Sequence, residues 1–230
     1  MIRGKEMKEK LKVRELFKLA MPIITYVPVY GIWFMMIEKH RFSHYALIHT
    51  GLDDAIPFCE LFIIPYYLWF LYVAGTVLYF LFTREVDVYY KDFMFLATGM
   101  TLFLIISTLF PNMHQLRPAV MPRDNVFTHL VSLIYKSDTP TNLWPSIHVY
   151  NSIGTMIAVH RSKNIKKPGK IFSDILGISI ILSTMFIKQH SIYDVVTAFI
   201  MALIFYLVFY HSTVVEEYCK KREEKYAFRY

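Results

Sequence analysis

The sequence predicts an all-α membrane protein, a single domain over residues 1–230 with six transmembrane helices and both termini in the cytoplasm. Apolar residues make up 55% of the chain and charged residues 19%, with a mean hydropathy of +0.36. Soluble domains are nearer a quarter charged. Six apolar runs approach the length that crosses a bilayer, and Lys and Arg are distributed unevenly between the loops. The contents of 8 Gly, 10 Pro and 2 Cys exclude collagen-like and disulfide-rich classes.

Each apolar run is judged against the roughly 20 residues that a spanning helix needs. The first run follows a basic segment, but it is too long for a signal peptide and no small-residue cleavage site follows it, so we expect an uncleaved span. Prolines within the first two runs are tolerated where neighbouring helices satisfy the freed carbonyls. The fourth run is short, with a polar start at the interface. The expected spans cover about residues 17–37, 61–82, 93–110, 145–159, 171–187 and 192–210.

The distribution of Lys and Arg orients these spans. With the N-terminus inside, the cytoplasmic segments hold 19 of the 25 basic residues and the outer segments hold six. An excess of basic residues marks the cytoplasmic side. It also accounts for the net charge of +7 without a nucleic-acid partner. Cys59 and Cys219 then lie on opposite sides, so we expect no disulfide between them.

The longest outer loop, about residues 111–144, mixes Pro, aromatic and charged residues, and loops of this length are usually functional or disordered. Asp53 and Asp54 precede the second span, and we interpret them mainly as part of a Pro-bounded turn. The other histidines have no supporting pattern and do not predict a metal site: His40, His44, His49, His114, His129, His160 and His211.

His190 and Asp194 open the sixth span and are four residues apart, so they share a helix face. A carboxylate there accepts a hydrogen bond from one imidazole nitrogen and leaves the other free as a nucleophile or base. Ionisable groups at a membrane boundary are costly and tend to be functional. The structural alternative is an interfacial His beside an Asp that the helix dipole favours.

Ser146 and His148 open the fourth span, where Ser146 can cap a helix whose free N–H groups bind anions. Arg117, Arg123 and Lys188 lie on the same predicted face and could bind a phosphate. Capping, an interfacial His and lipid headgroup contacts are the alternatives. Together these residues supply the parts for phosphoryl transfer through a phosphohistidine.

Arg117-Pro118, Pro145-Ser146-Ile147-His148 and the pair His190/Asp194 resemble, in this order, the motifs of the type 2 phosphatidic acid phosphatase superfamily. The resemblance covers about residues 53–194. The segments 138–142 and 183–190 are similar to a subgroup that includes inositol phosphorylceramide synthase-like and bacterial proteins. Two motif positions depart from the family, with Phe110 in place of Lys and Thr184 in place of Arg, and Lys188 is a candidate to supply the missing charge.

The resemblance implies a six-span lipid phosphatase with its site on the non-cytoplasmic face. His190 would take the phosphoryl group, Asp194 would orient it, and His148 would protonate the leaving group. Ser146, Arg117, Arg123 and Lys188 would bind the phosphate, without a metal or cofactor.

The expected substrate is a phosphomonoester or diphosphate of a lipid. The alternative is a phosphotransferase that uses the same residues with an alcohol acceptor. An intramembrane metal hydrolase would need a motif such as His-Glu-x-x-His, which the sequence lacks. A transporter with a His190–Asp194 proton relay would often show repeated halves, and no repeat is apparent. A six-span chain with no appended soluble domain suits a bacterial plasma membrane.

Overall fold

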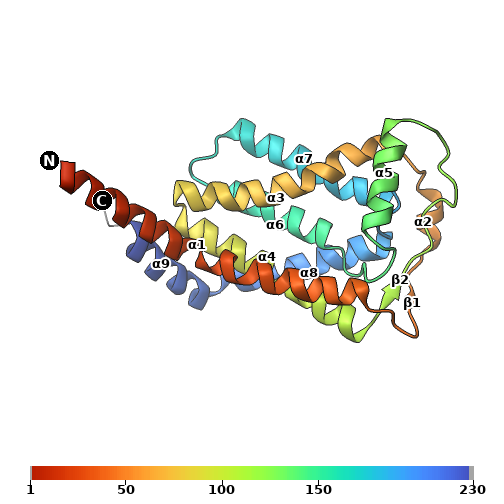
Figure 1. Cartoon of the computed structure of the whole chain (residues 1–230), viewed down its shortest axis with the longest axis horizontal. Coiled ribbons are helices and arrows are strands. Elements are labelled where there is room, and N and C mark those ends of the chain that lie inside the picture. The colour runs from red at the N-terminus through yellow and green to blue at the C-terminus, as the bar shows by residue number, and fades with distance from the viewer. Residues whose placement is uncertain (1, 228–230) are drawn as a thin grey trace.

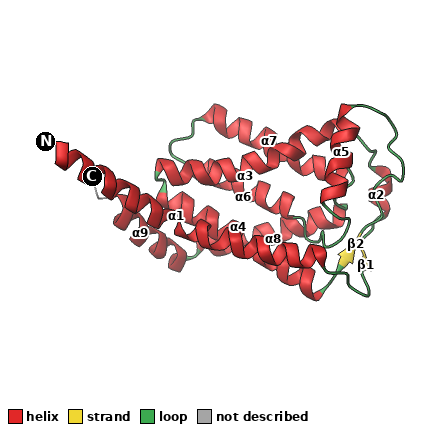
Figure 2. Ribbon diagram, viewed as in Figure 1, coloured by secondary structure: helices red, strands yellow, loops and turns green. Residues whose placement is uncertain are grey.

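The computed structural model describes the backbone of residues 2–227 and the side chains of residues 13–226, and its regular secondary structure is almost entirely α-helical (Figures 1 and 2). The only strands in this range form a two-stranded parallel pair in which Ala46 lies opposite Asn112. The elements, in chain order, are α1 (Ile2–Lys39), β1 (Ala46–Leu47), α2 (Gly51–Ala55), the 3₁₀ turn η1 (Glu60–Phe62), α3 (Ile63–Thr83), α4 (Val86–Leu109), β2 (Asn112–Met113), α5 (Val126–Ser137), α6 (Ile147–Arg161), α7 (Lys167–Phe186), α8 (Ile192–His211) and α9 (Thr213–Ala227).

Five helices within residues 2–227 are long and apolar enough to cross a membrane: Val13–Lys39, Glu60–Thr83, Val86–Leu109, Lys167–Phe186 and Ile192–His211. Large apolar side chains point outward from them, among them Leu71 on α3, Phe172 on α7 and Leu203 on α8, each more than half exposed. A helix that is apolar on its outer surface suits a lipid environment. The structure therefore confirms a largely helical chain with several membrane-type helices.

The fourth expected span is a helix at almost the expected position, but α6 has only 15 residues and is not among those five. It lies inside the bundle, against α3, α4, α7 and α8. Gly99 and Gly154 permit its close approach to α4, because the ring of Tyr150 lies over Gly99 and that of Phe95 over Gly154. Because protein surrounds it, α6 can bury polar side chains such as Asn151, which lowers its hydropathy.

The loop expected over residues 111–144 contains a helix that the apolar runs did not indicate. Asn125 caps α5 by accepting a hydrogen bond from the Thr128 N–H, and the Asn125 N–H donates to the Thr128 hydroxyl. The apolar face of α5 packs against α3 through Val131 and Ile134. Figure 1 shows α2, α5, β1 and β2 together at one end of the bundle, opposite α9 and the start of α1. The candidate site lies at the end that holds α5.

Candidate functional site

His190 and Asp194 meet as their spacing predicts. A turn at Lys188, with φ of 56°, ends α7, and Ser191 caps the start of α8. Nδ1 of His190 lies 3.1 Å from Oδ2 of Asp194, and the same oxygen accepts a hydrogen bond from the Ser191 N–H at 3.0 Å. Both side chains are buried, with 3% and 1% of their surface exposed. The carboxylate thus fixes the orientation of the imidazole.

His148, on the first turn of α6, extends this pair into a chain of three. Its Nδ1 lies 3.2 Å from Nε2 of His190. Its ring stacks on Tyr66 and lies against Trp69, with centroids 4.8 and 4.3 Å away. If Asp194 accepts the Nδ1 proton of His190, then Nε2 of His190 carries a lone pair and Nδ1 of His148 donates to it. The tautomer that suits a nucleophilic His190 therefore satisfies every contact in the chain.

Ser146 ties the two helix starts together. It is fully buried and caps α6, with its hydroxyl 3.4 Å from the Val149 N–H. Its own N–H donates to the main-chain oxygen of Asp194 at 3.4 Å. The N-termini of α6 and α8 therefore adjoin, and helix N-termini favour anions.

Arg117 contacts the site at Gln189, the residue that precedes His190. Its Nη2 donates to Oε1 of Gln189, and its Nη1 donates to the main-chain oxygen of Tyr135 at 3.2 Å. The guanidinium also lies over the Tyr135 ring, 4.4 Å from the centroid. Its Nε is buried with no hydrogen-bond partner among residues 2–227. Of the three cations expected to bind phosphate, Arg117 is the one that the structure brings beside His190.

Arg123 and Lys188, the other two cations predicted to bind phosphate, contact groups other than His148 and His190. Arg123 donates two hydrogen bonds to the buried carboxylate of Glu60, the first residue of η1. The Lys188 ammonium donates to the main-chain oxygens of Asp53 and Ile56, at 2.7 and 2.5 Å. Both cations fasten outer segments to the bundle, so this geometry does not support a role for them in phosphate binding.

Asp53 is structural, as interpreted from the sequence. Its carboxylate accepts hydrogen bonds from the Ser191 hydroxyl at 2.7 Å and the Ile192 N–H at 2.8 Å. It also accepts from the Thr50 N–H at 2.8 Å. Asp53 therefore caps α8 from a segment that lies 138 positions earlier in the chain than Ser191. Asp54 points outward and contacts His49 at 3.0 Å.

His114 and Asp138 adjoin the site but were not expected there. Nε2 of His114 lies 2.8 Å from the main-chain oxygen of Gln189, and Nδ1 accepts from the Leu116 N–H at 3.3 Å. Asp138 accepts long hydrogen bonds of 3.4 Å from Gln189 and Tyr66. No local spacing links these residues. The only feature of the sequence that pointed to Asp138 was the resemblance of residues 138–142 to the subgroup.

Burial determines the charge state of the histidines outside the spans. Burial and, to a smaller extent, the nearby Arg117 guanidinium lower the pKa of His190 to about 3. Burial likewise lowers the pKa of His114 to about 4. Both imidazoles are therefore neutral near pH 7, as a nucleophile and a hydrogen-bonded support require.

Asp138 shows the opposite effect of burial. Burial raises its pKa to about 6, although the Arg117 charge opposes the shift. The end of the bundle that holds α5 therefore combines neutral imidazoles with a buried cation and a weakly acidic carboxyl group. Among residues 2–227, no group of three or more His, Cys, Asp or Glu side chains is placed to hold a metal ion.

Comparison with known proteins gives no relative. No protein-family model, curated protein or solved structure matches the chain.

Proposed function

We propose that the chain is a lipid phosphate phosphatase that works through a phosphohistidine at His190. The observation that carries the proposal is the buried chain His148–His190–Asp194, with contacts of 3.2 and 3.1 Å. It supplies a nucleophile, a proton donor and an orienting carboxylate in one line. Arg117 and the adjoining helix N-termini supply positive potential for a phosphate. The motif resemblance supports the same assignment.

In the first step Nε2 of His190 attacks phosphorus, so that an N–P bond forms while the P–O bond to the lipid breaks. A phosphate monoanion brings one proton, which His148 takes up and delivers to the leaving oxygen. Asp194 stabilises the positive charge that develops on His190. Water then attacks the phosphohistidine, His148 accepts its proton, and the N–P bond breaks to release phosphate.

The resting distance between His148 and His190 has a consequence for binding. A separation of 3.2 Å leaves no space for a phosphorus atom and its leaving oxygen between the two rings. A substrate must therefore separate them as it enters. An apolar groove of about 450 Å³ lies beside the site, between Phe110, Trp144, Tyr193 and the β1 segment, and it suits a lipid tail.

A lipid phosphotransferase is the second candidate, and one observation favours it. His148 is 8% exposed and His190 3% exposed, and the rings of Tyr66 and Trp69 pack against His148. A site that excludes water would favour an alcohol as the acceptor of the phosphoryl group. The intermediate and the residues are the same in both reactions.

We further propose that α6 counts as a sixth span, that both termini are cytoplasmic and that the site faces outward in a bacterial plasma membrane. The excess of basic residues in the expected inner segments supports this orientation. In a variant with Cys59 and Cys219 replaced by Ser, a membrane-impermeant thiol reagent applied to intact cells should label Asp124→Cys but not Lys163→Cys. The opposite pattern would reverse the topology.

The deciding experiment measures phosphate release from a panel of lipid phosphates by the purified protein, with a chelator present. His190→Ala should reduce turnover by at least about 1,000-fold, and Asp194→Asn by about 100-fold or more. His129→Ala is the matched control, because His129 contacts Asp124 at 2.7 Å on the exposed surface. Full activity of His190→Ala would refute the mechanism. If no variant releases phosphate, lipid donors and alcohol acceptors test the transferase.

A further inference from the structure

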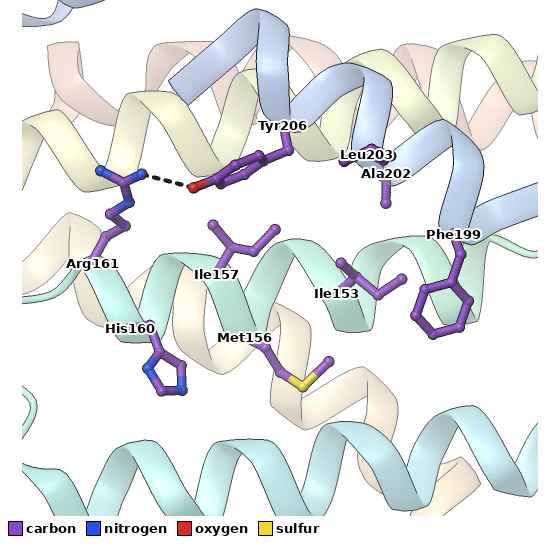
Figure 3. A pocket seen from close by; sticks show the side chains of 9 residues that line it. All are labelled: Ile153, Met156, Ile157, His160, Arg161, Phe199, Ala202, Leu203 and Tyr206. Atoms are coloured by element: carbon purple, nitrogen blue, oxygen red, sulfur yellow. Dashed lines mark hydrogen bonds between the residues drawn. The ribbon is translucent and has the colours of Figure 1, made fainter. Parts of the chain in front are cut away.

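A second binding feature lies in the half of the bundle away from His148. An open groove of about 440 Å³ runs between α6 and α8 (Figure 3). Its walls are apolar, with Ile153, Met156 and Ile157 from α6 facing Phe199 and Leu203 from α8. The groove opens outward, since Phe199 and Leu203 are about half exposed. It therefore faces the space that lipid occupies around a membrane helix.

The groove has a cation at one end. Nη2 of Arg161 donates to the Tyr206 hydroxyl at 3.0 Å, as Figure 3 shows, and the guanidinium lies 5.3 Å from the centre of the Tyr210 ring. These contacts hold the side chain in place, yet a guanidinium has five N–H donors and one is used here. Among residues 13–226, whose side chains the structure describes, no ion pair joins Arg161 to a carboxylate.

The segment around Arg161 is rich in cations, although the carboxylate of Glu85 lies beside it and accepts hydrogen bonds from the Ser162 hydroxyl at 2.7 Å and the Lys163 N–H at 3.0 Å. Residues 160–170 contain five Lys or Arg and no Asp or Glu. His160 is already paired, with Nε2 2.8 and 2.9 Å from the two oxygens of Asp174. An anion at this end of the groove would therefore bind Arg161. Basic pockets between membrane helices are typical binding sites for anionic lipid headgroups.

The length of the groove fits one leaflet. Ile153 and Arg161 are separated by about 12 Å along α6, at 1.5 Å per residue. Half of a hydrocarbon core is about 15 Å. An acyl chain that lies along the groove would thus reach from the middle of the bilayer to Arg161 at the headgroup level.

We propose that the α6–α8 groove binds an anionic phospholipid from the leaflet at the Arg161 end, with a tail along the apolar walls and its phosphate on the guanidinium. This site is distinct from the proposed catalytic one. His148 and Arg161 are about 20 Å apart along the same helix. The bound lipid would cover the outer side of the α6–α8 contact, where Phe199 and Leu203 are about half exposed.

The test compares lipid retention by the purified full chain in nonionic detergent, read by native mass spectrometry. The probes are dioleoyl-phosphatidylglycerol and dioleoyl-phosphatidylcholine. The wild type should retain phosphatidylglycerol preferentially, and Arg161→Gln should reduce this preference about fivefold. Arg222→Gln is the matched control, because Arg222 also donates to a tyrosine, Tyr218, at 3.1 Å and lies 5.0 Å from its ring centre, but it does not line the groove.

Several outcomes would overturn the proposal. Equal retention of both lipids by the wild type would show apolar adsorption, and equal losses in Arg161→Gln and Arg222→Gln would show a diffuse surface charge. Displacement of the lipid by soluble glycerol 3-phosphate would show a site for free anions. If Arg161→Gln does not fold, Leu203→Trp on the groove rim should reduce the retention of phosphatidylglycerol, and unchanged retention would count against the groove.

Discussion

Asp53 is expected to control both the stability of the bundle and the precision of the site. In Asp53→Ala the main-chain N–H groups of Ile192 and Thr50 lose their acceptor, and Asp53 is only 2% exposed. A fully buried donor without an acceptor costs about 1–3 kcal/mol. Because Thr50 and Ile192 are only half-buried, we take the lower half of that range, which gives about 3 kcal/mol for the two donors. For a chain of this size, 1 kcal/mol corresponds to about 2–4 °C in Tm, which gives a decrease of about 6–12 °C.

The assay is thermal unfolding in detergent, with phosphate release measured on the same samples below Tm. Turnover should also fall, because Asp53 fixes the start of α8 between His190 and Asp194. Asp54→Asn is the control, since Asp54 is exposed and contacts only His49 within the described chain. A Tm for Asp53→Ala equal to that of Asp54→Asn would refute the reasoning.

The same carboxylate predicts a pH dependence. Burial alone would raise the pKa of Asp53, but hydrogen bonds from Ser191, Ile192 and Thr50 outweigh it and hold the pKa below the usual 3.8. A lowered carboxyl pKa stabilises the folded state above pH 3.8, and this contribution is lost as the pH falls through the folded-state pKa. Asp53→Asn should therefore flatten the decrease in Tm below about pH 4. An unchanged slope in this variant would contradict the assigned hydrogen bonds.

Three further predictions concern other parts of the bundle. Arg123→Gln should lower Tm, because it removes the cationic partner of the buried Glu60 carboxylate, which keeps the hydrogen bond from Asn125 at 3.0 Å. It should not change turnover; a loss of turnover at full Tm would place Arg123 in the site. Between pH 6.5 and about 4 the lowered pKa of His114 makes the folded state bind fewer protons than the unfolded one, so stability falls as the pH falls. His114→Asn should show a shallower decrease in Tm over this window. Gly99→Ala should lower the free energy of unfolding by about 1–3 kcal/mol, because the added methyl group would lie 2.0 Å from a ring carbon of Tyr150. Gly75 has open space around it, so Gly75→Ala should raise the free energy of unfolding by up to about 1 kcal/mol. Equal Tm values for these two glycine variants would contradict the α4–α6 packing.

Hydropathy was sufficient to locate the long helices, because an apolar run of about 20 residues has few other solutions. It was insufficient for α5, whose 12 residues are amphipathic and lie in a loop between spans. The Asn125–Thr128 capping pair was the local signal for its start. Similarly, α6 was located but its environment was not, because hydropathy does not distinguish a helix enclosed by protein from a short span.

In the candidate site, contacts between residues close in the sequence were predictable and contacts between distant residues were not. The His190–Asp194 contact depends on i,i+4 spacing and was predictable. The contact of His114 with Gln189 joins residues 75 positions apart and has no sequence pattern. The hydrogen bonds of Lys188 to the main-chain oxygens of Asp53 and Ile56 also join distant segments, and the sequence has no pattern that predicts them.

The shortness of α6 sets how deeply the proposed chemistry is immersed. At 1.5 Å per residue, about 20 Å of helix separate Arg161 from His148, whereas a hydrocarbon core is about 30 Å thick. If Arg161 lies at one boundary, in the orientation proposed above, the start of α6 would lie as much as about 10 Å below the other boundary. His190 precedes the spanning helix α8 and would then lie in a recess of the protein, so a substrate phosphate would have to enter this recess below the level of the neighbouring headgroups. A bare phosphate can make this descent at a lower desolvation cost than one that carries a bulky polar alcohol, so depth itself would select lipids with small headgroups.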